Sequence, residues 1–278
     1  MEWFPKFADK WKNLDISPGE PLWANECELD IPVSVTRGNR EGYVDVLGNE
    51  ALDYYYIILV VPVIIASLII QSKLKSTYAK YSGVNNVKNL TGAQAAQMVL
   101  NYYGIYNVQI ESTPGMLSDH YDPTKNVIRL SDGVYNSTSV AAIGVACHEA
   151  GHAAQHAQGY TPIKIRNTIL PVCNIGSTLS MPLLLIGLVL SFEPLIWIGI
   201  GFFSFTAIFQ LITLPVEFNA SRRAMQAIGS GNLLTDEEQR GAKKTLKAAA
   251  MTYVAATAVA LAQLVRLLLL FSGRRRRD

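Results

Sequence analysis

The sequence predicts a mostly α-helical integral membrane protein with a small α+β insert and three to four transmembrane helices. Half of its 278 residues are hydrophobic and only 17% are charged, which is the balance of a membrane protein. Long apolar runs recur along the chain and match the length of bilayer-spanning helices. A polar stretch with turn signals and short apolar runs separates the first of these runs from the others.

Residues 54–71 form the first predicted transmembrane helix. The run has no charged residue and begins with three tyrosines, as expected for a spanning helix with an aromatic belt at the bilayer surface. Residues 168–214 are apolar but too long for one span, and Glu193-Pro194 divides them into a predicted helical hairpin. Residues 248–271 are a fourth candidate, in which Arg266 can snorkel if it lies near the bilayer edge.

The insert follows the first span and covers residues 72–167. Its element order is predicted to be helix, strand, strand, helix. Thr91 and Gln94 form a capping box that opens the first helix. Strands are expected at 107–111 and 127–131, on either side of a turn-rich loop.

Three further segments complete the predicted organisation. Residues 1–53 form an N-terminal extension of unknown role, because no motif in them can be attached to chemistry. Residues 215–247 form a helix and loop after the hairpin, and Pro215 is expected to open a new turn there. Residues 272–278 are a basic tail with four arginines.

The motif that carries chemistry is HEAGH, which begins at His148 on the last helix of the insert. Ser137 or Thr138 can cap this helix. Residues four apart on a helix lie about 40° apart in projection, so His148 and His152 point to one place. Two imidazoles supply half of a tetrahedral zinc shell, and Glu149 beside the metal can take a proton from bound water.

A pair of satisfied histidines on an ordinary amphipathic helix is the alternative interpretation. The residues at positions 150, 151, 153 and 154 are all Ala or Gly, and such small residues favour the metal site because they leave room for an ion. We therefore expect one Zn²⁺ per chain.

A catalytic zinc site needs a third protein ligand. His156 continues the histidine stripe, but a straight helix places it about 12 Å along the axis from His148. Glu217 is the other candidate, at the predicted exit of the hairpin. A glutamate at a helix exit is commonly a solvated flank, but two intervening spans return Glu217 to the side of the membrane that holds His152.

Five segments of the chain carry a family resemblance. They are QSKLKSTYAKYS at 71–82, LTGAQAAQMVL at 90–100, LSDHYDPTKNVIRLSDGVY at 117–135, ACHEAGHAAQH at 146–156 and FQLITLPVEFNASRRA at 209–224. With these segments the chain resembles the neutral zinc metallopeptidases of the YugP-like membrane protease family, and the likeness covers nearly all of the chain after residue 53. The sequence is more distantly similar to the gluzincin plan of membrane peptidases of the HtpX and CAAX prenyl protease type, in which an HExxH helix is followed by a later glutamate helix.

The resemblance implies a gluzincin-like catalytic insert with His148, His152 and Glu217 as zinc ligands and Glu149 as general base. It also implies that residues 127–131 form an edge strand with which an extended substrate could pair.

The sequence departs from the gluzincin plan at one position. Gluzincins often carry an aspartate four residues after the ligand glutamate, where it supports a histidine ligand, whereas this chain has Ser221. Ser221 or Asn219 could take over that supporting role.

A peptidase of this class also needs a donor for the oxyanion. His120 and Tyr121 precede the predicted second strand and could supply one. The alternative is that His120 belongs to a turn stabilised by Asp119 and Asp122.

Together these features predict a multi-pass cell-membrane zinc endopeptidase that cuts peptides or proteins, plausibly membrane proteins, near the surface of the lipid bilayer. The net charge of +2 and the lack of basic tracts interleaved with aromatics exclude nucleic acid as an expected partner. Lysines and arginines beside the first three spans favour a cytoplasmic catalytic part, whereas Arg274 to Arg277 argue for the opposite orientation. The oligomeric state is left open.

Two other functions compete with this prediction. A site-2-type intramembrane metalloprotease would need the histidine motif inside a spanning helix and an aspartate in another span, and no predicted span contains one. A non-catalytic, metal-containing membrane scaffold or chaperone is the second rival. Glu149 distinguishes a peptidase from a scaffold, because a structural metal site does not need a base beside the ion.

Overall fold

The computed structural model describes residues 54–115 and 118–274. The chain divides into two units, Met1–Tyr54 and Tyr55–Asp278, and the description below concerns the second. The predicted N-terminal extension 1–53 and the last residues of the basic tail lie outside the described residues.

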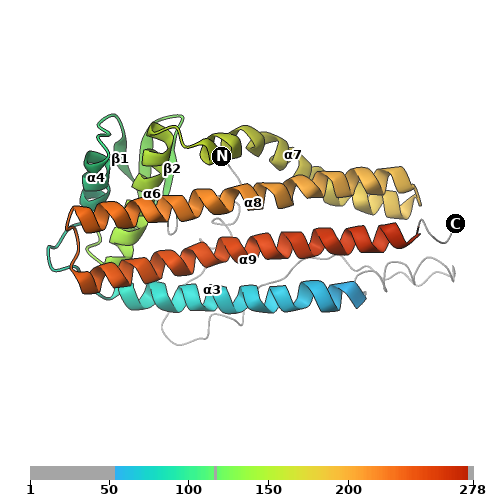
Figure 1. The fold of residues 1–278 in the computed structure, drawn as a ribbon, viewed down its shortest axis with the longest axis horizontal. Coiled ribbons are helices and arrows are strands. Elements are labelled where there is room, and N and C mark those ends of the chain that lie inside the picture. Colours follow the sequence, from blue (N-terminus) through green and yellow to red (C-terminus); the bar gives the residue numbers. More distant parts are fainter. Residues whose placement is uncertain (1–53, 116–117, 275–278) are drawn as a thin grey trace. The chain divides into compact units, whose positions relative to one another are not determined.

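The described chain is mostly helical and contains one small sheet (Figure 1). The insert between the first and second long helices holds the sheet and three of the shorter helices. In chain order the elements are the π-helical turn η1 (Tyr56–Val60), α3 (Val61–Ser82), α4 (Gly92–Tyr102), β1 (Gln109–Thr113), β2 (His120–Asp122), β3 (Val127–Ser131), α5 (Asp132–Tyr135), α6 (Val140–Ala157), α7 (Thr161–Val189), α8 (Glu193–Ser230) and α9 (Asp236–Arg274).

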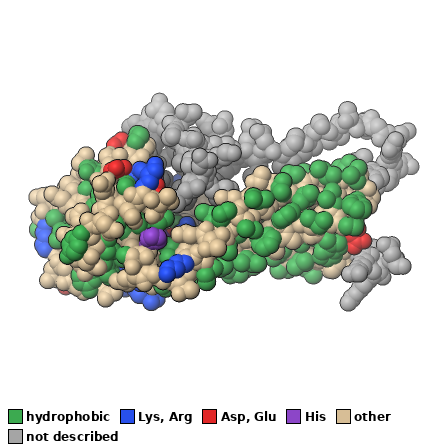
Figure 2. All heavy atoms as spheres, turned by 90° about the horizontal axis from the view of Figure 1, so that it is seen from above, with side chains coloured by type: hydrophobic (Ala, Val, Ile, Leu, Met, Phe, Trp, Pro, Cys, Tyr) green, Lys and Arg blue, Asp and Glu red, His purple; other side chains and the backbone are tan. Residues whose placement is uncertain are grey.

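Four helices are long and apolar enough to cross a membrane, namely Tyr56–Ser82, Thr161–Val189, Glu193–Ser230 and Asp236–Ser272. Helix α8 has 38 residues and α9 has 39. At 1.5 Å per residue each is about 57 Å long, about twice the 30 Å of a bilayer core. Both helices can therefore cross a bilayer and still extend beyond it into water. Figure 2 shows hydrophobic side chains gathered over the long helical part.

The long helices pack side by side. The main contacts join α7 to α8, α8 to α9, and α9 to α3, and Figure 1 shows α8, α9 and α3 running alongside one another. Helix α8 thus lies between α7 and α9, and its C-terminal end also packs on α6.

Pro215 does not open a new turn, and the predicted break there is wrong. Helix α8 continues through this proline to Ser230, and α7 likewise contains Pro171 and Pro182. A proline removes one backbone hydrogen bond, but neighbouring helices and threonine side chains compensate for it in membrane helices. In the turn before Pro215, the Thr213 hydroxyl donates to the carbonyl of Phe209.

The sheet has the order β1-β3-β2, with β1 parallel and β2 antiparallel to β3. The prediction that Val127–Ser131 forms an edge strand is therefore wrong, because this strand is central. Its burial explains the position, since Val127, Ile128 and Leu130 are all buried. The three residues of β2 are too few to show the alternation that predicts a strand.

The capping box is confirmed. Thr91 accepts a hydrogen bond from the backbone of Gln94, and the Gln94 side chain accepts one from the backbone of Thr91. Helix α6 is capped one residue later than predicted. Ser139 accepts from the backbone N–H of Ala142, while Ser137 instead donates to the Ser139 hydroxyl.

One hydrophobic core joins the insert to the C-terminal end of α8 and the N-terminal end of α9. It packs α4, α6 and one face of the sheet against these two helices, so that α6 lies at its centre. Its largest fully buried side chains include Leu100, Ile128, Leu130, Ile143 and Ile228.

Candidate metal centre

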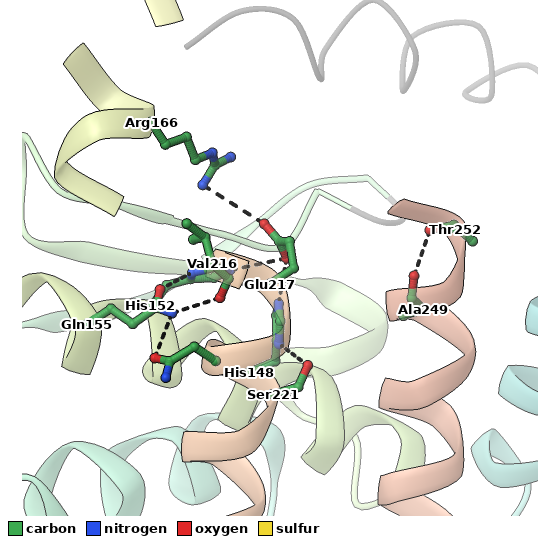
Figure 3. Close-up of polar contacts among 10 residues, drawn as sticks. His148, His152, Gln155, Arg166, Val216, Glu217, Ser221, Ala249 and Thr252 are labelled. Atoms are coloured by element: carbon green, nitrogen blue, oxygen red, sulfur yellow. Dashed lines mark hydrogen bonds and ion pairs between the residues drawn. The ribbon is translucent and has the colours of Figure 1, made fainter. Parts of the chain in front are cut away.

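Two helices from distant parts of the chain bring the candidate ligands together (Figure 3). His148 and His152 lie one turn apart on α6, with ring centroids 4.7 Å apart. Glu217 enters from α8 and is 3% exposed. Its Oε2 lies 3.3 Å from His148 Nε2 and 3.5 Å from His152 Nε2.

These distances match a tetrahedral metal shell. Two ligands bound at about 2.0–2.1 Å in tetrahedral geometry lie about 3.3–3.4 Å from each other, close to the separations that Glu217 makes with the two histidines. The three ligand atoms all lie within 4.8 Å of one another. His148, His152 and Glu217 could thus hold one divalent ion with a fourth position open, and two nitrogens with one carboxylate oxygen suit zinc.

The second nitrogen of each histidine has its own partner. His148 Nδ1 lies 3.1 Å from Ser221 Oγ, and His152 Nδ1 lies 3.0 Å from Gln155 Oε1. An imidazole whose Nδ1–H donates in this way presents the lone pair of Nε2. In both residues that nitrogen faces Glu217.

Ser221 therefore contacts a candidate ligand, as the resemblance suggested for this position, whereas Asn219 lies one layer further out. Asn219 Oδ1 accepts hydrogen bonds from Gln155 Nε2 and from Arg223 Nε. Gln155 was not foreseen. Its signal in the sequence is a polar residue three positions after His152, and it is fully buried, donating also to the carbonyl of Val216.

Gly151, inside the motif, allows α6 and α8 to approach closely. A Cβ at this position would lie 2.5 Å from the carbonyl oxygen of Ala220, shorter than any normal contact. Ala150, Ala153 and Ala154 are also buried in the core. The expectation that these small residues leave room for a metal needs correcting, because the room is filled by the packed core and by α8.

Glu149 is partly buried beside the cluster. Burial raises the pKa of Glu149 to about 7, and the neighbouring carboxylates of Asp119 and Glu217 add to that rise. His148 and the backbone N–H of Tyr121 act in the opposite direction and lower the pKa. The backbone of Tyr121 in β2 therefore lies within hydrogen-bonding reach of the Glu149 carboxyl group.

The polar contacts of the His120 and Tyr121 side chains are made within the turn and sheet. His120 Nδ1 donates to the carbonyl of Ser118 at 2.7 Å, and its Nε2 is 3.5 Å from Arg129 Nη1. The Tyr121 hydroxyl donates to Asn126. These contacts agree with the alternative in which His120 belongs to the polar network of the turn and sheet, where Arg129 also pairs with Asp122.

Two further residues approach Glu217 from the helices on either side of α8. Arg166 on α7 places Nη1 3.9 Å from Glu217 Oε1, and the hydroxyl of Tyr253 on α9 interacts with the same carboxylate. In the sequence Arg166 is one of the basic residues beside the predicted spans, and Tyr253 lies within the fourth apolar run. A lone arginine near the start of a helix, or a lone tyrosine within a long one, carries no motif that could have revealed either role.

Comparison with known proteins places this cluster in a family. Residues 56–272 match the model of a family described as "Putative neutral zinc metallopeptidase". The chain is 45% identical over 220 residues to the "Putative membrane protease YugP" of Bacillus subtilis (strain 168), an alignment that covers 79% of this chain and 98% of that protein. No solved structure matches the chain. The chain therefore belongs to the family described as putative neutral zinc metallopeptidases.

Proposed function

We propose that this protein is a zinc-dependent endopeptidase that hydrolyses peptide bonds at the surface of the membrane. The observation that carries the proposal is the pair of distances, 3.3 and 3.5 Å, from Glu217 to the two histidines of the motif. His148, His152 and Glu217, with Glu149 on the same helix as the histidines, are the residue types that a gluzincin-like site would use, which supports the proposal. When bound, zinc supplies a Lewis acid and lowers the pKa of a coordinated water.

In this proposal each residue of the site has its own role. His148, His152 and Glu217 hold the metal and leave its fourth position open. Glu149 takes a proton from the attacking water and returns it to the leaving amine. Ser221 and Gln155 hold the two imidazoles in the orientation and tautomer that binding requires.

The position of the site along the long helices supports cleavage near the bilayer surface. Glu217 lies 24 residues after the start of α8 at Glu193, and Arg166 lies 23 residues before the end of α7 at Val189. At 1.5 Å per residue these separations are about 36 and 35 Å, slightly more than a bilayer core of about 30 Å. We infer that the substrates are membrane proteins or segments that flank a span.

The positive-inside rule supports a cytoplasmic site, because most lysines and arginines beside the long helices lie at the same ends as the cluster, although Arg274 to Arg277 follow the opposite end of the last helix. A site-2-type intramembrane mechanism is disfavoured. Helix α6 has 18 residues, packs within the core of the insert and is not one of the four candidate spans.

The test uses the purified protein in detergent, with Glu149→Gln and Glu217→Ala as variants. Metal content is measured by mass spectrometry and cleavage is followed with casein. We expect one zinc in the wild type, retained metal without cleavage in Glu149→Gln, and loss of metal in Glu217→Ala. A wild type that holds zinc but cuts nothing would favour a scaffold, and a Glu217→Ala variant with full zinc would overturn the ligand set.

A further inference from the structure

Arg166 has donor capacity that the described protein does not use. Its side chain is 29% exposed, and its Nη1 faces Glu217 Oε1 rather than the Oε2 that points to the histidines. The separation of 3.9 Å is an ion pair but is too long for a hydrogen bond. The Nε of Arg166 is buried and has no hydrogen-bond partner among the described residues (Figure 3).

A buried guanidinium donor without a partner is costly, and such groups in native proteins call for an explanation. Arginine carries five N–H donors in a planar fork that matches a negatively charged oxygen. The guanidinium of Arg166 lies beside the carboxylate of Glu217, a candidate metal ligand.

The charge that develops during the reaction suggests what the Arg166 donors can bind. When water attacks the scissile carbonyl, a C–O bond forms, Glu149 takes the proton of the water, and the carbonyl π electrons move to oxygen. The carbonyl oxygen thereby becomes an oxyanion, and a guanidinium, which stays charged, is a strong hydrogen-bond donor to such an oxygen.

We propose that Arg166 is a catalytic residue that donates a hydrogen bond to the scissile carbonyl oxygen as it becomes an oxyanion. The role rests on the proposed peptidase function. Arg166 takes the role of oxyanion donor, for which the sequence suggested His120 and Tyr121. The side chains of those two residues have other hydrogen-bond partners. When the C–N bond breaks, the electrons of the oxyanion return to re-form the carbonyl, Glu149 passes its proton to the amine, and Arg166 releases the oxygen.

An arginine near a peptidase site could instead bind the terminal carboxylate of the substrate, as in a carboxypeptidase. That carboxylate lies about one residue, or about 3.8 Å of chain, beyond the scissile carbonyl. A comparison of substrates with a free and with an amidated C-terminus distinguishes these two roles.

The test compares Arg166→Gln with Lys164→Gln in the full-length protein. Lys164 lies on the same helix and is exposed, so the control removes the same charge two residues away. Zinc content, kcat and KM are measured with an internally cleaved peptide, once with a free C-terminus and once as its amide. We expect wild-type zinc in both variants, a fall in kcat of about 10²–10³ only in Arg166→Gln, and nearly unchanged KM.

Chemical rescue adds a second measurement. Millimolar guanidinium should restore part of the activity of Arg166→Ala and should not change that of Lys164→Gln, because only the first variant leaves a guanidinium-shaped gap at the oxyanion.

Each contrary outcome has its own meaning. A zinc-loaded wild type without cleavage overturns the proposed function and this role with it. An active wild type with an equally active Arg166→Gln overturns this role alone. Loss of zinc in Arg166→Gln would make Arg166 a positioning residue, and an effect confined to the free C-terminus and to KM would make it a carboxylate-binding residue.

Discussion

Substitution of Gly151 by alanine tests how helix packing builds the metal site. The added Cβ would lie 2.5 Å from the carbonyl oxygen of Ala220 and 3.1 and 3.3 Å from its carbonyl and α carbons. All three are backbone atoms of α8, so no side-chain rotation can relieve the contact. A normal carbon–oxygen contact of about 3.3 Å requires α8 to retreat by about 0.8 Å, and proteins resist such overpacking.

The retreat would carry Glu217 away from the two histidines, because it lies on α8 one turn before Ala220. Metal–ligand distances in working sites hold to about 0.2 Å, so a shift of about 0.8 Å removes Glu217 as a ligand unless the helix bends. We expect zinc affinity to fall at least about tenfold and the protein to lose about 1–3 kcal/mol of stability. A chelator competition titration and thermal unfolding measure these two effects.

Gly144 provides the matched control on the same helix. A Cβ at Gly144 would meet Ala242 at an ordinary 3.7 Å. Gly144→Ala should bind zinc as the wild type does and gain up to about 1 kcal/mol from helix propensity. Wild-type zinc affinity in Gly151→Ala would refute the reasoning, because α8 would then not need its close approach to α6 to place Glu217.

Three further outcomes follow from the contacts around the site. Ser221→Ala should weaken zinc binding about tenfold, because His148 Nδ1 loses its partner, whereas Ser221→Asp should restore or strengthen it; equal affinities in the two variants would contradict this. Gln155→Met should weaken zinc binding by about 10–100-fold and lower Tm, because His152 Nδ1 loses its acceptor and the buried Val216 carbonyl loses a donor; isothermal titration and calorimetry measure both. In chelator, burial holds the pKa of Glu149 at about 7 against an ordinary 4.5, so folding binds a proton between these values and stability should fall as pH rises from about 4.5 to about 7. Glu149→Gln should remove that part of the pH dependence of Tm, and an unchanged profile would show that Glu149 is not the group responsible.

Several features follow from the sequence alone because their causes are local. The pairing of His148 with His152 depends only on the helical repeat, and the capping box at Thr91 depends on residues three apart. Apolar runs long enough to span a bilayer can be read from composition, and four such helices are present. The two spans between His152 and Glu217 made Glu217 a candidate ligand, and the resemblance to the metallopeptidase family implied the same residue.

Other features were decided by contacts between residues far apart in the chain. The family resemblance implied that Val127–Ser131 is an edge strand, but pairing with β2 makes it central. The three residues of β2 are too few to show the alternation that predicts a strand. Pro215 looked like a break and is not, because the packing around α8 outweighs the lost hydrogen bond.

The surroundings of the metal centre show the same division. A helix periodicity can place two histidines on one face, but only tertiary packing decides that Gly151 meets Ala220 and thereby sets Glu217 within 3.5 Å of both imidazoles. Arg166 likewise reaches the site only because α7 lies against α8. The chemical type of the site was thus determined by local sequence, while its completeness was decided by the tertiary structure, because hydrogen bonds and charges act through space between side chains that the sequence keeps far apart.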